Sequence, residues 1–346
     1  GSEGDFVACH SFEDLKNALS APRAILLMVK AGDAVDAVIE ELLPSLESGD
    51  IIIDGGNSRF TDTDRREKEL KVKGIRFFGM GVSGGEEGAL KGPSMMPGGD
   101  KEAYEGMKTL LEAMAAEDGE GGKCVTHIGS GGSGHFVKMV HNGIEYAVMQ
   151  LLCETYDVLK HAGRLGNDEL AHVFREWSKG EDLGSFLLEI TAKIFLKKDD
   201  DTGKHLIDFV ADRAGQKGTG KWTTEAAMDL GVAIPTITAA VDARILSGDM
   251  AMRETGKNMP TALLDQSADG REVAAQCRSS LELSVILAYI QGFELIRHAS
   301  EEYGWNIDLS EVARIWRGGC IIRSVQLPIL QAAFRDDGAV ERDILI

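Results

Sequence analysis

Short, continuous apolar runs alternate with segments of helical spacing over residues 24–129. Each apolar run has the length of a strand that is buried on both faces of a sheet. The predicted strands are 24–29, 50–56, 74–82 and 123–129. The predicted helices between them are 32–46, 61–74 and 101–116. Strands that alternate with helices in this way indicate βαβ units and a parallel sheet.

Strand signals end at about residue 134, and helical segments follow one another from there. A long helix at 134–161 joins the two parts of the chain. The helices predicted after it are 167–178, 185–197, 223–230, 234–246, 271–303 and 309–315. The sequence therefore predicts an α/β domain over residues 1–131 and an all-helical domain over residues 132–346.

The segment HFVKMVHNGIEY carries polar side chains inside the otherwise apolar long helix. Counted from the lysine, they recur at i+3, i+4, i+7 and i+8, which places them on one sector about 140° wide. These residues are Lys138, His141, Asn142, Glu145 and Tyr146. Gly143 is unfavourable inside a helix and suggests that something approaches the backbone closely there. The alternative interpretation is a solvated polar face.

Three glycine-containing segments follow predicted strands, where ligands of open parallel sheets bind. They are VKAG, DGGNS and GVSGGEEGALKGPSMMPGG. In the third segment Ser83, Gly84 and Gly85 could offer a hydroxyl and backbone N–H groups to an anion. A flexible surface loop is the alternative. No G-x-G-x-x-G opens a first helix, and GSGGSG at 129–134 follows a late strand, so the pyrophosphate site of a dinucleotide domain is not in this chain.

Isolated basic residues occur further along the chain. Lys217 and Thr219 lie among glycines in AGQKGTGKW, which would suit a phosphate or hydroxyl clamp or a solvated turn. Arg244 lies in an apolar helix, where an arginine usually snorkels or forms a salt bridge. Arg317 and Arg323 in WRGGCIIRS have no role that the sequence reveals.

The composition excludes several classes of function. Of the 346 residues, 43% are hydrophobic and 27% are charged, as in an ordinary folded protein of roughly two domains. No apolar run approaches the ~20 residues of a membrane span, and no signal peptide is evident. The net charge of −19 disfavours nucleic-acid partners and anionic membranes.

The cysteines and the chain ends add two expectations. The five scattered cysteines form no CxxC pair, which indicates reduced thiols, a cytoplasmic location and no metal site, with an organellar form left open. The opening GSEGDF resembles a tag remnant that runs into mid-domain sequence, and the chain stops at ERDILI without a tail. We therefore expect a fragment, or a chain with missing ends.

Four segments together resemble the 6-phosphogluconate dehydrogenase family over essentially the whole chain. They are SGGEEGALKGPSMMPGG, GHFVKMVHNGIEY, GQKGTGKWT and WRGGCIIRS. The resemblance implies a homodimer with a Rossmann-type coenzyme domain, here incomplete at its N-terminus, followed by a large helical domain. It also implies NADP-dependent oxidative decarboxylation of 6-phosphogluconate to ribulose 5-phosphate and CO2, in the pentose phosphate pathway. The family's coenzyme loop and its 2′-phosphate-binding arginine would precede this chain. The tail that reaches the partner's active site would follow Ile346.

The resemblance also implies residue roles. Lys138 would be the base for hydride transfer and would later polarise the ketone, while Glu145 would donate the final proton. Two turns of one helix face separate them, or about 10–11 Å of axial rise. The residues implied for the substrate are Asn57, Ser83, Gly84, Gly85, His141, Asn142, Tyr146, Lys217, Thr219 and Arg244. Of these, the last four would bind its phosphate. Those implied for the coenzyme are Val29, Lys30, Ala31 and Asn57. Lys138 must be neutral to act as a base, so burial would have to lower its pKa.

Two rival interpretations remain. A β-hydroxyacid dehydrogenase of the 3-hydroxyisobutyrate type would share the glycine run and the lysine and asparagine at i and i+4. Glu145, Lys217 and Arg244 instead favour a phosphorylated substrate that needs protonation after decarboxylation. The other rival is a non-catalytic fragment that folds and dimerises but cannot hold coenzyme.

Overall fold

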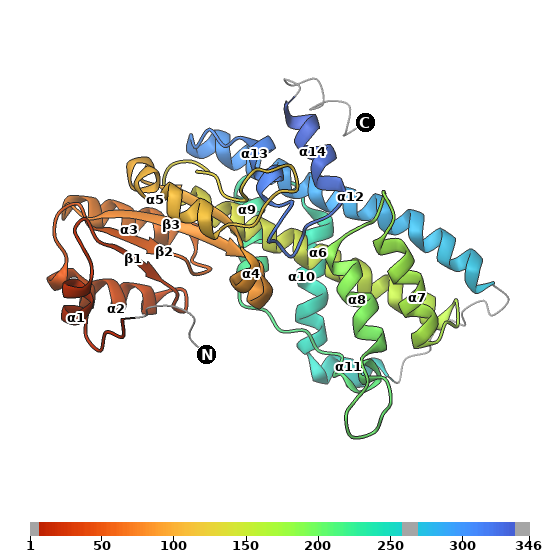
Figure 1. Cartoon of the computed structure of the whole chain (residues 1–346). Coiled ribbons are helices and arrows are strands. Elements are labelled where there is room, and N and C mark those ends of the chain that lie inside the picture. Colours follow the sequence, from red (N-terminus) through yellow and green to blue (C-terminus); the bar gives the residue numbers. More distant parts are fainter. Residues whose placement is uncertain (1–6, 258–268, 336–346) are drawn as a thin grey trace.

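The computed structural model describes residues 7–257 and 269–335. An α/β part, red to yellow in Figure 1, lies beside a larger helical part, and the long helix α6 (Ser133–His161) runs between them. The predicted fold class is confirmed. The expectations about the two chain ends concern residues outside the described ranges.

The sheet has four strands in the order β1-β2-β3-β4. Their bounds are β1 Ala24–Leu27, β2 Ile51–Asp54, β3 Arg76–Ser83 and β4 Ser94–Gly99. The first three strands are parallel, with Leu27 opposite Asp54 and Asp54 opposite Gly79. The carboxyl ends of β1, β2 and β3 therefore meet at one edge, where the predicted ligand segments lie.

Helices cover both faces of this sheet. Their bounds are α1 Phe12–Ala18, α2 Asp33–Leu42, a 3₁₀ turn Leu43–Ser45, α3 Phe60–Val72, α4 Gly85–Lys91 and α5 Lys101–Met114. Ile52 belongs to one core with Val35 of α2 and Leu70 of α3. Its neighbours Ile51 and Ile53 belong to another core with α5. This alternation follows from the two-residue period of a strand and explains why β2 is apolar throughout.

The predicted fourth strand at 123–129 is wrong. The fourth strand is β4, which runs antiparallel to β3 inside the segment that we expected to be a glycine-rich loop. Its glycines are needed by packing, because a Cβ on Gly98 would overlap the backbone of Gly134 in α6. Residues 123–129 run beside β4 through an isolated bridge between Met95 and Val125 and through separate backbone hydrogen bonds, such as that from Ile128 to the carbonyl of Pro97 at 2.8 Å, but they form no strand. The glycine and proline residues concealed a buried strand that pairs with β3 and packs against α6.

The helical part follows the predicted order with three differences. After α6 come α7 Asn167–Ser178, α8 Phe186–Leu196, a 3₁₀ turn Leu206–Phe209, α9 Thr219–Asp229, α10 Pro235–Gly248, α11 Met250–Gly256, α12 Gly270–Tyr303, α13 Leu309–Ile315 and α14 Gln326–Arg335. Helix α9 begins four residues before its predicted start, and α11 and α14 were not predicted. The α/β part likewise contains α1 and α4, which were not predicted.

Helices α6 and α12 pack against each other at the centre of the helical core. They approach closely at Gly292, where a Cβ would lie 2.5 Å from the Cδ1 of Ile144. Among the described residues, α12 has the length and the mean hydropathy, 1.3, that a membrane span needs. Its buried residues, including Leu281, Val285 and Phe293, belong to the protein core, so packing accounts for its apolar character.

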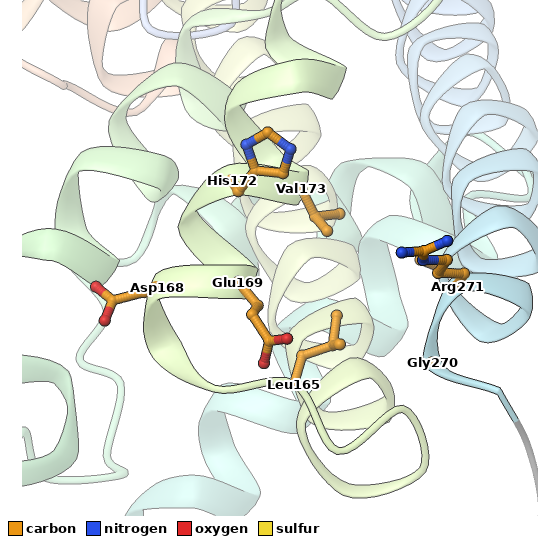
Figure 2. Close-up of a pocket in the computed structure, with 8 residues that line it drawn as sticks. Leu165, Asp168, Glu169, His172, Val173, Gly270 and Arg271 are labelled. Carbon is orange, nitrogen blue, oxygen red and sulfur yellow. The ribbon is translucent and has the colours of Figure 1, made fainter.

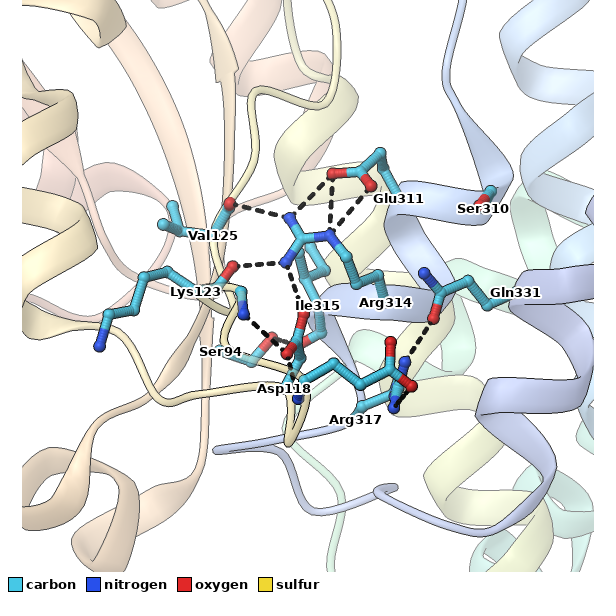
Figure 3. A network of polar contacts seen from close by, with 12 residues as sticks. Ser94, Asp118, Lys123, Val125, Ser310, Glu311, Arg314, Ile315, Arg317 and Gln331 are labelled. Carbon is cyan, nitrogen blue, oxygen red and sulfur yellow. Dashed lines mark hydrogen bonds and ion pairs between the residues drawn. The ribbon is translucent and has the colours of Figure 1, made fainter. Parts of the chain in front are cut away.

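Arg314 of α13 joins the helical part to the α/β part (Figure 3). Its guanidinium donates to the carbonyl oxygens of Lys123, at 2.7 Å, and Val125, at 3.4 Å, and pairs with Asp118. Nearby, the hydroxyl of Ser94 donates to the carbonyl of Ile315 at 2.7 Å. These contacts hold the segment after α13 against β4, close to the end of β3.

The two arginines without a predicted role have structural partners in this region. Arg317 binds Gln331, at 2.8 Å, and Glu120, at 2.7 Å. The guanidinium of Arg323 lies over the ring of Phe186, 4.1 Å from its centroid. Both arginines therefore help to fix the segment that follows α13.

Candidate active site

The polar residues of α6 form one connected and buried group. The Nζ of Lys138 donates to the Oδ1 of Asn142 at 2.7 Å and lies 3.3 Å from the Nδ1 of His141. Lys138 is 5% exposed and His141 is fully buried. The alternative of a solvated polar face is therefore wrong, because these groups face the α/β part and the neighbouring helices.

Two glycines of β3 allow α6 to lie this close to the sheet. A Cβ on Gly81 would overlap the side chain of Lys138, and a Cβ on Gly79 would lie 2.6 Å from the Nδ1 of His135. Residues i and i+2 of a strand point to the same face. The glycine spacing therefore seats the first turns of α6 directly on β3 and places Lys138 near the carboxyl end of that strand.

His141 has two further partners on its Nε2 atom. The Oγ of Ser83 lies 3.0 Å away and the Sγ of Cys320 lies 2.9 Å away. Cys320 was not among the predicted site residues, although the sequence segment WRGGCIIRS contains it. Only the arginines of that segment carry an obvious chemical signal, and a single buried cysteine usually indicates packing.

Burial shifts the ionisation of the central groups. It lowers the pKa of Lys138, and the negative charges of Glu145 and Cys320 oppose this effect. Burial, and then the charge of Lys138, keep the pKa of His141 well below its usual value. Burial also raises the pKa of the Cys320 thiol to about 12. The neutral forms of all three groups are thus favoured, which is the state that a lysine base requires.

Glu145 lies at the less buried end of this group. Its Oε2 is 4.0 Å from the Nδ1 of His141, and its side chain is 18% exposed. Burial raises the pKa of its carboxyl group, while the charges of Lys138 and Arg244 act against that shift. A carboxyl group that keeps its proton above the usual pH range can serve as an acid.

Asn142 and Tyr146 connect α6 to helices α9 and α10. The Nδ2 of Asn142 donates to the Oγ1 of Thr219 at 3.1 Å. The guanidinium of Arg244 lies 3.5 Å from the ring centroid of Tyr146 and donates to the carbonyl of Gly215 at 2.8 Å. The structure therefore brings Tyr146, Thr219 and Arg244 together. Arg244 stacks on the tyrosine ring and does not form a salt bridge within the described residues.

Close packing also explains two glycines at this junction. A Cβ on Gly143 would lie 2.8 Å from the Cγ2 of Thr223, so α9 is what approaches the backbone there. A Cβ on Gly220 would lie 2.6 Å from the ring of Tyr146. The start of α9 is thus pressed against the polar face, and its N-cap, Gly218, makes no side-chain capping bond.

Lys217 stands just before α9 but remains apart from the connected group. Its side chain is exposed and has no hydrogen bond or ion pair with any other residue in the described ranges. It is close along the chain to Gly218 and Thr219, so it lies at the same end of α9.

Ser83, Gly84 and Gly85 form a fixed turn between β3 and α4. Ser83 is 4% exposed, and both glycines have positive φ angles, 126° and 57°. A Cβ on Gly84 would lie 2.7 Å from the carbonyl oxygen of Gly319. The alternative of a flexible surface loop is wrong, since the segment continues into α4 and β4.

The predicted coenzyme residues follow β1 and β2 at the same sheet edge. The amide of Gly55 donates to the carbonyl of Leu27 at 2.9 Å, and a Cβ on Gly56 would lie 3.1 Å from the carbonyl oxygen of Val29. The two loops therefore lie side by side. Lys30 and Asn57 are exposed, while Val29 and Ala31 are half-buried. Within the described ranges, none of these four residues hydrogen-bonds to the polar face of α6.

A separate cavity of 370 Å³ opens between the first turns of α7 and α12 (Figure 2). Its lining includes Asp168, Glu169, His172 and Arg271, and none of the predicted site residues. A smaller cavity of 160 Å³ is lined by Gly84 and Cys320 among others, and so borders the group around His141. The candidate site is therefore the α6 group and not the larger cavity.

Comparison with known proteins gives a consistent result. The model for the NAD-binding domain of 6-phosphogluconate dehydrogenase matches residues 2–129, and the model for the C-terminal domain of 6-phosphogluconate dehydrogenase matches residues 134–345. A decarboxylating 6-phosphogluconate dehydrogenase of Synechococcus elongatus is 52% identical over 96% of this chain and 71% of the relative. An NADP(+)-dependent decarboxylating relative of Bacillus subtilis is 53% identical over 95% of this chain and 70% of its own length.

A solved structure agrees with these sequence relatives. The 6-phosphogluconate dehydrogenase of Plasmodium falciparum, studied as apo protein and with NADP+ or 6-phosphogluconate, superposes with a TM-score of 0.89. The two sequences are 45% identical, and the match covers 95% of this chain and 71% of that chain.

Proposed function

The chain belongs to the 6-phosphogluconate dehydrogenase family, and from this premise we propose that the buried polar face of α6 is its catalytic centre. The protein is an NADP-dependent oxidoreductase that decarboxylates 6-phosphogluconate to ribulose 5-phosphate and CO2. The observation that carries the assignment of the centre is the buried amine of Lys138, held by Asn142 at 2.7 Å. Burial lowers the pKa of this amine, which favours the neutral form that a base requires.

Lys138 is the base of the oxidation. A neutral amine has a lone pair that can take the proton of the C3 hydroxyl while a hydride leaves C3. NADP, when bound, supplies the acceptor for that hydride. The protonated Lys138 then hydrogen-bonds to the new C3 carbonyl, which draws electrons from the breaking bond between C1 and C2 as CO2 leaves.

Glu145 completes the reaction by protonating the enediol at the carbon that becomes C1 of the product. Burial raises the pKa of its carboxyl group, which favours the protonated form that this role requires. Once Lys138 is charged, its positive field lowers the pKa of Glu145 and favours release of the proton. Proton uptake by the lysine and proton release by the glutamate are thus linked.

The surrounding residues bind the sugar acid. We assign the substrate hydroxyls to His141 and Asn142, and the carboxylate end to Ser83, Gly84 and Gly85. We assign the phosphate to Tyr146, Lys217, Thr219 and Arg244. The open N-terminus of α9 supports the phosphate assignment, because its free N–H groups and helix dipole favour an anion. The unpaired cation of Lys217 stands at the same place.

The two loops after β1 and β2 fit the nicotinamide end of NADP. Gly55 and Gly56 leave no space for a Cβ, so the two loops approach each other closely. Val29, Lys30, Ala31 and Asn57 would hold this end of the coenzyme. Asn57, which follows β2 directly, would also contact the substrate.

The assembly and the domain limits are further parts of the proposal. We infer a homodimer in which a C-terminal tail of the partner subunit completes the substrate site, as the family resemblance implies. We divide the chain into a coenzyme domain over residues 1–131 and a substrate and dimerisation domain over residues 132–346, near the start of α6 at Ser133. We place the protein in the cytoplasm, in keeping with its five free cysteines.

The decisive experiment compares three substrates under identical conditions with NADP. Turnover of 6-phosphogluconate, with release of CO2, is expected to exceed that of gluconate, because gluconate lacks the phosphate that the phosphate-binding residues would hold. Preferred turnover of 3-hydroxyisobutyrate would overturn the substrate assignment. Failure of any substrate to react, in a chain that binds 6-phosphogluconate, would favour the non-catalytic fragment instead.

A further inference from the structure

His135 is a buried, polar residue of α6 that the mechanism above does not use. It precedes Lys138 by three residues, so the two side chains lie on neighbouring turns of one helix face. Its side chain is 1% exposed. Its Nδ1 lies 2.7 Å from the Oγ1 of Thr63 in α3, which is also 1% exposed. This pair therefore joins α3 directly to the catalytic helix.

The ring of His135 lies on Gly79 of β3, which is opposite Asp54 at the end of β2. The ring is therefore next to the start of the loop that carries Asn57, and its Nε2 has no hydrogen-bond partner among the described residues. Burial lowers the pKa of the imidazole, with the charge of Arg66 acting in the same direction and that of Asp54 against it.

The ring cannot move away from this position. Strand β3 passes over it at Gly79, where a Cβ would lie 2.6 Å from Nδ1 of His135 and 2.7 Å from the Cγ2 of Thr63. The ring is thus enclosed by β3, by α3 and by the loop after β2. Because a side chain that is closely packed on three sides cannot shift alone, a displacement of one surrounding element displaces the others.

The loop itself is rigid at its base. The carboxylate of Asp54, which is fully buried, accepts from the amide of Gly56 at 3.0 Å and from the hydroxyl of Ser58 at 2.6 Å. Asn57 lies between these two anchors. The side chain of Asn57 is therefore carried by a fixed turn that begins beside the ring of His135.

We propose that His135 is a positioning residue that sets the loop of Asn57 relative to Lys138, and so aligns the coenzyme side of the site with the catalytic base. The inference rests on the proposed function for its kinetic consequence, but the contact between the ring and the loop does not depend on that function. Hydride transfer requires alignment within a fraction of an ångström, and displacement by about 1 Å can cost about 10²-fold in rate.

Two variants separate the two halves of the ring. His135→Asn retains an amide at the position of Nδ1 and removes Nε2, whereas His135→Gln places its amide near Nε2. His172→Asn, at an exposed histidine of α7, is the matched control. Thr63→Val removes the hydroxyl and preserves the shape of the side chain.

The first measurement is amide hydrogen exchange of residues 54–58 in the full chain without coenzyme or substrate. His135→Asn is expected to speed exchange at Gly56 and Asn57 by about tenfold or more, because the loop loses its contact with α6. His135→Gln is expected to restore part of the protection, and His172→Asn to leave exchange unchanged. Equal exchange in His135→Asn and the parent protein would overturn the contact.

The second measurement is the isotope effect on kcat with 6-phosphogluconate deuterated at C3. His135→Asn is expected to lower kcat by about tenfold or more and to raise this isotope effect, with KM for 6-phosphogluconate changed less than about threefold. A merely structural role would reduce the folded fraction without changing the isotope effect. A parent protein that shows no turnover refutes the proposed function, and the exchange experiment still decides the role of His135. Altered exchange with an unchanged isotope effect refutes the alignment role alone.

Discussion

Asn142 accepts a hydrogen bond from the amine of Lys138 at 2.7 Å, one turn along the same helix. A neutral amine has two N–H groups and one lone pair, so this bond uses a donor and leaves the lone pair for the substrate. The amide nitrogen of Asn142 donates in turn to Thr219 at 3.1 Å. The orientation of the base is therefore tied to the start of α9, where we place the substrate phosphate.

Replacing Lys138 by methionine is expected to remove oxidation with little loss of substrate affinity. The thioether has similar length but no lone pair basic enough to take the C3 proton. General bases typically contribute ~10²–10⁴-fold, so kcat should fall by that range while the Kd for 6-phosphogluconate changes only a few-fold. Calorimetric titration and steady-state assays measure the two quantities. Lys108→Met, at an exposed lysine of α5, is the control, and activity of Lys138→Met within about tenfold of the parent would refute the base.

The same substitution is expected to change how stability depends on pH. Folding lowers the pKa of Lys138 from its usual 10.5, so the unfolded chain binds more protons than the folded one between the folded-state pKa and 10.5. In that window the free energy of unfolding rises with pH. Lys138→Met lacks this contribution, so the parent protein should gain stability over the variant as the pH approaches 10.5.

Urea denaturation of the two proteins at a series of pH values measures this difference. Lys108→Met should follow the parent at every pH. A constant difference between the parent and Lys138→Met would show that the amine is charged in the folded protein, and the base assignment would lose its electrostatic support.

Much of this site follows from sequence periodicity alone. The helical period, in a helix that is long enough, is sufficient to predict that Lys138, His141 and Asn142 share one face. The direction of that face could not be predicted, because its burial depends on α9 and β3. Thr219 lies 77 positions from its partner Asn142, and Ser83 lies 58 positions from its partner His141. Those contacts enclose the polar face and exclude the alternative of a solvated one.

The errors have a related cause. Glycine and proline normally indicate loops, yet in β4 Gly98 is required because α6 leaves no space for a Cβ. Cys320 lies 179 positions from His141, and nothing in its own segment indicates the contact. Local patterns predict elements, whereas such tight approaches depend on the assembled fold.

Glu145→Gln is expected to impair protonation of the enediol more than hydride transfer. Glutamine keeps the shape and can hydrogen-bond, but it has no proton to give at the pH of the reaction. Incorporation of solvent deuterium at C1 of ribulose 5-phosphate should slow by ~10²-fold or more, while NADPH formation in a single turnover slows less. Glu302→Gln, at an exposed glutamate of α12, provides the matched control. Deuterium incorporation at the parent rate would rule out Glu145 as the proton donor.

Ser83 and Cys320 are expected to act on His141 as a pair whose effects are not additive. Both lie within hydrogen-bonding distance of the same Nε2, at 3.0 Å and 2.9 Å, and His141 is fully buried. If Cys320→Ala removes one partner, the hydroxyl of Ser83 can still satisfy the ring. The combined variant leaves a buried ring nitrogen without a partner, which costs about 1–3 kcal/mol, and the ring is then free to turn away from Lys138.

A double-mutant cycle on kcat/KM tests this relationship with Ser83→Ala, Cys320→Ala and the combined variant. Ser83→Ala also removes a substrate contact, but that loss occurs in both arms of the cycle and cancels from the interaction term. We expect the combined variant to fall below the product of the two single effects by about fivefold or more, as neighbouring groups with a shared partner do. Cys277→Ala, at a half-buried cysteine of α12 outside the site, should show no such interaction with Ser83→Ala. Strict additivity between Ser83 and Cys320 would mean that only one of them holds the ring.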